Sequence, residues 1–175
     1  MINRGRRVLL GLVVMLGGVV CAQAQTERAA TWRVATEKEL AAIIPERAQV
    51  VAERIETELR TASGVTDGRG RYVVGVVLIT AGYSANDKYS DYLMTQAPLQ
   101  IGSVVLPEGR YLLGWTRGTD ELEVTISEAA SGRPVVKVKA VPAVNIRGVQ
   151  SIHIWPPSDH SVIQLGRFMV PYSIP

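Results

Sequence analysis

Residues 121–140 read ELEVTISEAASGRPVVKVKA, and their pattern predicts an antiparallel β-hairpin. Apolar and polar residues alternate on both sides of a turn that contains small residues, glycine and proline. This period of two is that of a strand with one buried face. A register that places Val124 opposite Val138 buries both side chains. The same register places Glu123 opposite Lys139, so charge and burial favour one pairing.

The strand pattern continues on both sides of this hairpin. Residues 72–81 (YVVGVVLITA) are apolar on both faces, which predicts a central strand covered by a helix on one side and by more protein on the other. Residues 106–109 (LPEG) are typical of a tight turn that precedes a strand. Residues 144–155 and 161–170 predict a second hairpin around a loop that contains two prolines.

Two short segments resemble a known group of proteins. Residues 106–111 (LPEGRY) form a predicted turn and strand, and residues 128–134 (EAASGRP) form a predicted hairpin tip. Together they resemble exported bacterial β-domain proteins of unknown function that carry an LPxGxY element. The resemblance lies within residues 106–134. It implies no activity, and no catalytic residue follows from it.

The segment that precedes these strands predicts a helix. Thr36 and Glu39 lie three residues apart, as in a capping box, in which each side chain accepts from the backbone N–H of the other. Over about residues 36–63, apolar residues recur every three or four positions, which is the spacing of one helix face. Pro45 interrupts this run, so we expect a kinked helix.

These patterns predict an α+β fold in a single domain, residues 25–175, with its β-rich region at about 71–170. The N-terminal kinked helix is expected to pack on a mainly antiparallel β-sheet or flattened β-sandwich. Three of the 19 Lys and Arg residues precede residue 8, so residues 25–175 hold 16 basic and 16 acidic side chains. Because nucleic-acid binding requires a cationic surface, this balance predicts no nucleic-acid partner.

Residues 1–24 have the organisation of a signal peptide. Arginines are followed by an apolar and glycine run at residues 8–20, and Ala22 and Ala24 supply the small residues that signal peptidase reads. We expect cleavage after Ala24 and an exported protein, periplasmic or secreted, with no transmembrane segment in the mature chain. Lipidation at Cys21 is the alternative to its removal with the signal.

The two histidines, His153 and His160, lie close together in the sequence. With Asp159 they supply two imidazoles and a carboxylate, ligand types that suit Zn or Cu. A surface histidine beside a loop carboxylate explains the same residues, so both interpretations stay open. Residues 158–161 (SDHS) contain the residue types of a hydrolase triad, but a triad requires side chains that converge from separate parts of a fold.

Aromatic residues supply a second candidate surface. Trp155 and His153 are expected on the outer face of one strand, and Tyr83, Tyr89 and Tyr92 occur in an irregular stretch. Rings of this kind stack on sugars and peptides. The sequence therefore predicts ligand contacts at these five residues.

The chain contains no G-x-S-x-G element, no glycine-rich phosphate loop and no H-E-x-x-H element. The function that the sequence favours is therefore an exported, non-enzymatic binding or structural-interaction domain with a protein, peptide or glycan partner. A periplasmic metal-binding protein that uses His153, Asp159 and His160 is the alternative. A hydrolase is the third hypothesis.

Overall fold

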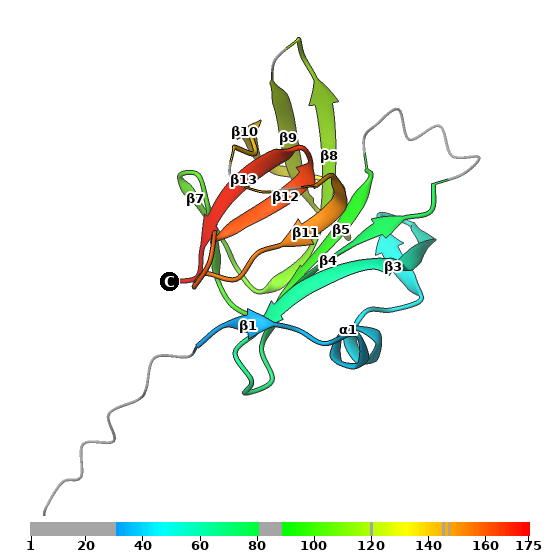
Figure 1. The fold of residues 1–175 in the computed structure, drawn as a ribbon. Coiled ribbons are helices and arrows are strands. Elements are labelled where there is room, and N and C mark those ends of the chain that lie inside the picture. The colour runs from blue at the N-terminus through cyan, green and yellow to red at the C-terminus, as the bar shows by residue number, and fades with distance from the viewer. Residues whose placement is uncertain (1–30, 81–88, 120, 145, 147) are drawn as a thin grey trace, which may run out of the picture.

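The computed structural model describes residues 31–80, 89–119, 121–144, 146 and 148–175. Within these ranges, 13 strands form a curled antiparallel sheet, a half-barrel, and one helix packs on it (Figure 1). The expected signal peptide at residues 1–24 lies outside the described residues, and so does Tyr83.

Most of the described chain is extended. The helix is α1 (Glu37–Ile43). The strands are β1 (Arg33–Val34), β2 (Arg47–Val50), β3 (Glu53–Thr66), β4 (Tyr72–Leu78), β5 (Asp91–Thr95), β6 (Leu99–Ile101), β7 (Val104–Leu106), β8 (Gly109–Arg117), β9 (Leu122–Glu128), β10 (Pro134–Pro142), β11 (Gln150–Ile154), β12 (Val162–Gly166) and β13 (Phe168–Ser173). Neighbours in the sheet follow the order β1-β3-β4-β5-β8-β9-β10-β13-β12-β11, while β2 pairs with β3, and β6 pairs with β13 and β7.

The predicted hairpin of β9 and β10 is confirmed together with its register. Val124 lies opposite Val138, and Glu123 lies opposite Lys139. The Val124 side chain is fully buried. The ion pair of Lys139 runs diagonally, because its Nζ lies 2.8 Å from a carboxylate oxygen of Glu121. The alternation of buried and exposed side chains therefore determines the register, and the lysines form ion pairs with diagonal neighbours.

The predicted central strand at residues 72–81 is confirmed over Tyr72–Leu78, and Ala81 lies outside the described residues. β4 lies between β3 and β5, and both of its faces are covered. Val73 belongs to the apolar cluster inside the half-barrel. Val74 belongs to a second cluster on the outer face, to which α1 contributes Leu40 and β2 contributes Ala48. The helix and the β2 strand thus cover the outer face of β4.

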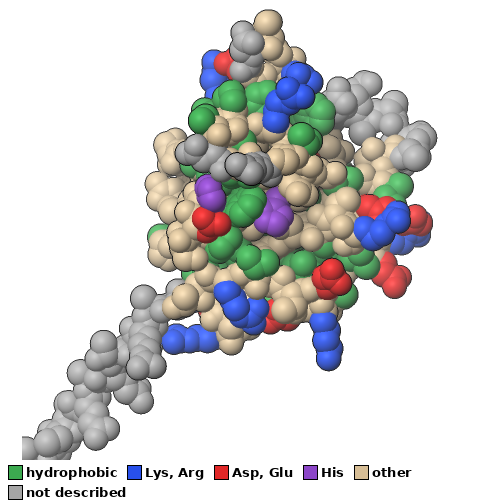
Figure 2. Space-filling view, viewed as in Figure 1, with side chains coloured by type: hydrophobic (Ala, Val, Ile, Leu, Met, Phe, Trp, Pro, Cys, Tyr) green, Lys and Arg blue, Asp and Glu red, His purple; other side chains and the backbone are tan. Residues whose placement is uncertain are grey.

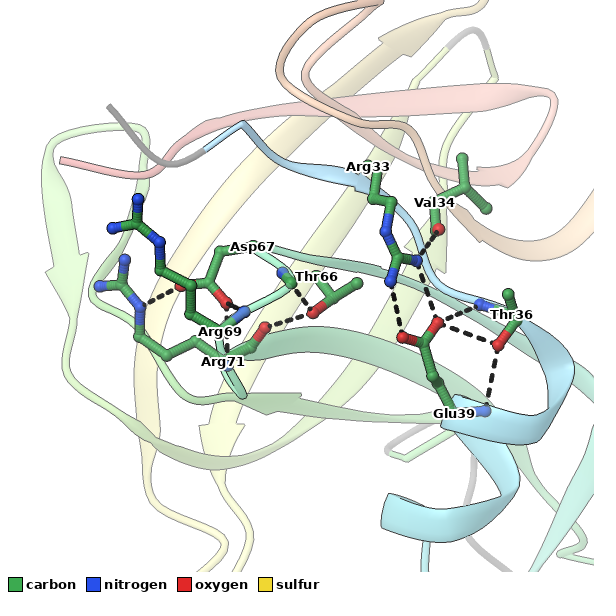
Figure 3. A network of polar contacts seen from close by, with 9 residues as sticks. Arg33, Val34, Thr36, Glu39, Thr66, Asp67, Arg69 and Arg71 are labelled. Atoms are coloured by element: carbon green, nitrogen blue, oxygen red, sulfur yellow. Dashed lines mark hydrogen bonds and ion pairs between the residues drawn. The ribbon is translucent and has the colours of Figure 1, made fainter. Parts of the chain in front are cut away.

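The expected α+β fold, with a kinked helix over residues 36–63, is wrong. The capping box is confirmed, because Thr36 Oγ1 accepts from the Glu39 backbone N–H and Glu39 accepts from the Thr36 backbone N–H. Arg33 of β1 binds the same Glu39 carboxylate at 2.7 Å (Figure 3). The helix nevertheless ends at Ile43, and the chain continues as the β2–β3 hairpin.

Tertiary pairing explains why the longer helix does not form. In the first part of β3, Ile55 and Thr57 are buried, whereas Glu56 between them is exposed and Leu59 is 39% exposed. These residues satisfy the period of a strand as well as the period of a helix. As a strand they pair with β2 and β4, whereas a helix here would leave the edge of β4 unpaired. Long-range pairing therefore outweighs local helix preference.

The turn between β3 and β4 lies at one end of the half-barrel. Asp67 in this turn accepts from the backbone N–H groups of Arg69 and Arg71 and from Arg71 Nε at 2.7 Å (Figure 3). Burial raises the pKa of Asp67, but these hydrogen bonds outweigh it and hold the pKa below its usual value. The Arg71 guanidinium also lies 5.7 Å from the centre of the Trp32 ring, which is buried in the interior.

The two ends of the curled sheet meet where β11 lies against β3 and β4. Within the described chain no backbone ladder joins β11 to either strand. The Ile154 backbone N–H instead donates to Ser63 Oγ at 3.0 Å. Ile152 lies over Gly75, where an added Cβ would approach Ile152 Cδ1 to 2.5 Å. We refer to these four residues as the seam.

Replacement of Gly75 by alanine tests the seam. We expect Gly75→Ala to lower the free energy of unfolding by about 1–3 kcal/mol, because the new methyl group forces Ile152 away from β4. Gly118→Ala is the matched control, since the flexible Glu121 side chain is its nearest neighbour. Urea unfolding measures both changes. Equal stability of the two variants would show that the close approach at Gly75 is unimportant.

Candidate functional site

A cavity of about 480 Å³, called the large cavity below, lies at the end of the half-barrel opposite the β3–β4 turn. Within the described chain no ladder closes the curled sheet. The cavity lies among the last residues of β4, β8 and β12 and the first residues of β5, β9, β11 and β13. Its lining residues are Val77, Ser90, Asp91, Trp115, Arg117, Leu122, Val149, Gln150, Ser151, Leu165, Gly166, Arg167 and Phe168.

The floor of the cavity is apolar. Leu122 and Leu165 are buried members of the interior cluster, and Val77, Trp115 and Phe168 pack against that cluster from the cavity side. The strand period places these side chains on the inner face of the sheet. A ligand in the cavity therefore contacts hydrocarbon and indole surface without opening the core.

Asp91 is the buried polar group of this cavity. It is the first residue of β5, its Cα lies opposite Val77 of β4 and Leu113 of β8, and it is only 3% exposed. The Ser90 hydroxyl donates to Asp91 Oδ2 at 2.8 Å. Among the described residues, no ion pair joins a cation to this carboxylate. Burial raises the pKa of Asp91 to about 7, and the hydrogen bond from Ser90 opposes that rise only in part.

The backbone holds Ser90 in place. Its N–H donates to the Leu113 carbonyl at 2.8 Å, and its own carbonyl accepts from the Leu78 N–H at 3.0 Å. Ser90 is thus fixed between β4 and β8 at the point where β5 begins. The position of the Asp91 carboxyl group is consequently determined by the sheet itself.

Two arginines lie at the mouth of the cavity. Arg117 ends β8, and Arg167 lies in the turn between β12 and β13. Both are exposed, and neither forms an ion pair with a described residue, in contrast to Arg33 and Arg71. With Asp91 they are the ionisable residues of the described lining. Both arginines thus place cationic groups at the mouth.

Other hollows on the described surface are less suited to a ligand. A cavity of about 460 Å³ at β2 and the start of β8 is lined by Glu128, whose carboxylate is bound by Arg133. A smaller cavity of about 220 Å³ lies along the seam and shares Gln150 and Ser151 with the large cavity. Neither has an ionisable side chain as deeply buried as Asp91.

The aromatic surface predicted from the sequence lies beside the seam. Ile152 and Ile154 face the interior, so His153 lies on the opposite face of β11. The Trp155 ring lies between the two imidazoles, 4.6 Å from the centre of His153 and 5.1 Å from that of His160. Figure 2 shows the two histidines on either side of hydrophobic side chains on this face.

Trp155 has a structural contact that the sequence does not reveal. Its Nε1–H donates to Gln164 Oε1 at 3.0 Å, and the Gln164 amide group donates to the carbonyls of Gly148 and Gly166. Gly166 lines the cavity, and Gly148 precedes the lining residue Val149. The predicted contact residue thus supports the wall of the cavity from outside.

The residues predicted to bind metal are only partly brought together. His160 Nδ1 lies 2.7 Å from Asp159 Oδ1. His153 Nδ1 instead lies 3.2 Å from Ser63 Oγ, and burial lowers the pKa of His153. In the described residues no group of three or more His, Cys, Asp or Glu side chains is arranged to hold a metal ion. A site for Zn or Cu at His153, Asp159 and His160 stays a prediction.

The tyrosines predicted to contact ligand are also separated. Tyr92 is 2% exposed and belongs to the outer apolar cluster, where burial raises the pKa of its hydroxyl group. Tyr89 is partly buried and packs against the same cluster. Tyr83 lies outside the described residues. Ser161, from the predicted triad residues, donates its hydroxyl hydrogen to the Tyr172 carbonyl.

Sequence reasoning missed the residues of the large cavity. Asp91 stands directly before the buried run YLMT, and an acidic residue at the start of a strand buried on both faces was the available signal. Arg117 ends one apolar strand and Arg167 follows another, and both look like ordinary surface residues in the sequence. Only the curl of the sheet brings them to the same mouth.

Comparison with protein-family models, with curated proteins and with solved structures found no match for this chain. Among the described residues, no helix has the length and apolar character that a membrane span requires.

The pH dependence of stability tests the burial of Asp91. Because its pKa is about 7 when folded and about 3.9 in an unfolded chain, the uncharged acid stabilises the fold below pH 4, and this contribution is lost as pH rises through 7. We expect Asp91→Asn to gain stability relative to the unmodified protein between pH 5 and pH 8, by a few kcal/mol at most.

Urea unfolding at a series of pH values measures this difference. Glu53→Gln is the control, since that carboxylate is exposed at the start of β3. A difference between Asp91→Asn and the unmodified protein that does not change with pH would contradict the burial of an unpaired acid.

Proposed function

We propose that this protein is an exported binding domain whose ligand, a small and partly apolar molecule, occupies the large cavity. The observation that supports this most directly is an apolar cavity of about 480 Å³ that is lined by a buried carboxyl group and by two guanidinium groups with no ion-pair partner among the described residues. Its volume lies within the range of small-molecule sites, which combine apolar walls with a few polar groups.

Binding is favoured over catalysis by the chemistry of the lining. The described lining offers two serine hydroxyl groups, Ser90 and Ser151, and one carboxyl group, Asp91. Ser90 precedes β5 and hydrogen-bonds Asp91, the first residue of that strand. Nucleophilic catalysis requires a base that activates the hydroxyl group and donors that stabilise the developing charge. His153 and His160, the two imidazoles of the chain, are not among the lining residues.

The size of the cavity supports a small-molecule ligand in place of the protein, peptide or glycan that the sequence favours. Cavities of this volume enclose most of the surface of a drug-sized molecule. A protein, a long peptide or a glycan chain would place only a small part of its surface there. The proposal therefore commits to a small molecule.

A thermal-shift screen with a library of small molecules tests the proposed site. A compound at about 100 times its dissociation constant adds roughly 2.7 kcal/mol to the free energy of unfolding, which raises the melting temperature by several degrees. We expect Val77→Phe to reduce the affinity of any hit at least about tenfold, because the larger ring occupies the cavity.

Ile79→Phe is the matched control, since Ile79 follows the same strand but is exposed and lies outside the cavity lining. Circular dichroism checks that both variants fold. Hits that bind Val77→Phe and the unmodified protein equally would place the ligand elsewhere and contradict the proposed site.

Export is tested by fractionation and mass spectrometry. The mature protein is expected outside the cytoplasm with Gln25 as its first residue, because Ala22 and Ala24 fit the small-residue requirement of signal peptidase. Replacing Ala24 by aspartate should leave the precursor uncleaved. A lipid-modified chain that begins at Cys21 would replace the cleavage prediction, and an uncleaved cytoplasmic chain would contradict export.

A further inference from the structure

The charges around the large cavity favour one class of ligand. Among the described residues three ionisable side chains line it, the acid Asp91 and the arginines Arg117 and Arg167. The acid is buried beside the apolar floor, whereas both arginines are exposed at the mouth. The positive charges therefore lie at the exposed mouth of the cavity, and the apolar surface lies deeper inside.

Neither arginine is neutralised within the described chain. Basic residues of the neighbouring β9–β10 hairpin are paired, as Lys137 is with Glu123 and Lys139 with Glu121. Arg117 ends the strand that precedes this hairpin, yet neither of these carboxylates bonds to it. An unpaired guanidinium presents several N–H donors in one plane, which match the two oxygens of a carboxylate.

The buried acid is compatible with a bound anion. Among the described residues no cation is placed to compensate a charge on Asp91, and burial raises its pKa. An uncharged carboxyl group donates a hydrogen bond and repels no anion. The other ionisable groups on the described lining, from β8 and from the β12–β13 turn, are the two arginines. The described part of the lining is thus positive overall in weakly acidic and neutral solution.

We propose that the cavity binds an amphipathic monocarboxylate, whose carboxylate is held by Arg117 and Arg167 and whose apolar body lies against Trp115, Leu165 and Phe168. This inference rests on the proposed function and names its ligand class. The apolar body of the ligand replaces water on the apolar floor. Its carboxylate stays at the mouth, where water and the guanidinium groups both donate hydrogen bonds to it.

Three probes with the same apolar chain test the ligand class. Octanoate, 1-octanol and octylamine are titrated into the protein at pH 6.5, each below its solubility limit and the two ionic probes below the concentration at which they form micelles, and isothermal calorimetry measures each affinity. We expect octanoate to bind at least about tenfold more tightly than octanol, because it alone brings a negative charge and two equivalent acceptor oxygens to the arginines. Octylamine should bind more weakly than octanol.

Matched variants assign the charge recognition to the mouth. Arg117→Gln and Arg167→Gln should each lower the octanoate affinity about tenfold and leave the octanol affinity unchanged. Arg54→Gln removes one positive charge from the exposed part of β3, outside the cavity, and should change neither affinity. Raising the pH from 6 to 8 should weaken octanoate binding to the unmodified protein but not to Asp91→Asn.

The outcomes separate the two proposals. Equal binding of octanoate and octanol, both lost in Val77→Phe, would overturn the carboxylate preference and leave the small-molecule site in place. Tighter binding of octylamine, lost in Asp91→Asn, would overturn the inference in favour of a cationic ligand. If none of the three probes binds, the monocarboxylate inference is overturned, and the library screen with Val77→Phe decides the proposed function separately.

Discussion

The close approach of β11 to β3 and β4 is the constraint on which the rest of the structure depends. A sheet that curls back on itself must satisfy or cover the strands that meet, and here no ladder joins them in the described chain. Ser63 supplies one acceptor for the backbone of Ile154, and Gly75 leaves room for Ile152. These contacts involve side chains at single positions of β3 and β4. The two ends of the sheet are therefore held together at Ser63 and Gly75 and not by a continuous ladder.

This mode of closure makes the two ends of the half-barrel different. At one end the Arg71–Asp67 hydrogen bond holds the β3–β4 turn, and Trp32 lies in the interior cluster. The large cavity lies at the other end, and Asp91 is among its lining residues. A buried acid with no cation among the described residues destabilises the fold when it ionises, and such groups are frequent at functional sites. The same carboxyl group that weakens the fold at high pH thus marks the cavity as the candidate site.

Much of the β-rich region was predictable from the sequence. The register of β9 and β10 followed from Val124 and Val138, because alternation of burial is a local property that few alternative pairings can satisfy. The capping box at Thr36 followed for the same reason, since its partners are three residues apart. The prediction of a helix beyond Ile43 was wrong because the apolar residues of this stretch fit both the helix period and the strand period. Pairing with β4 decides for the strand.

The sequence by itself determined the local elements, namely the strand periods, the turns, the capping box and the balance of charge. The tertiary structure alone decided which residues form the candidate site. Asp91, Arg117 and Arg167 are far apart in the chain, and no local pattern relates them, because their proximity depends on how far the sheet curls. Trp155 and His153, which the sequence favoured for contact with a ligand, are instead tied by hydrogen bonds to the wall of the cavity and to the seam. A curl is the sum of many small twists between strands, and it is therefore a property of the assembled sheet rather than of any segment.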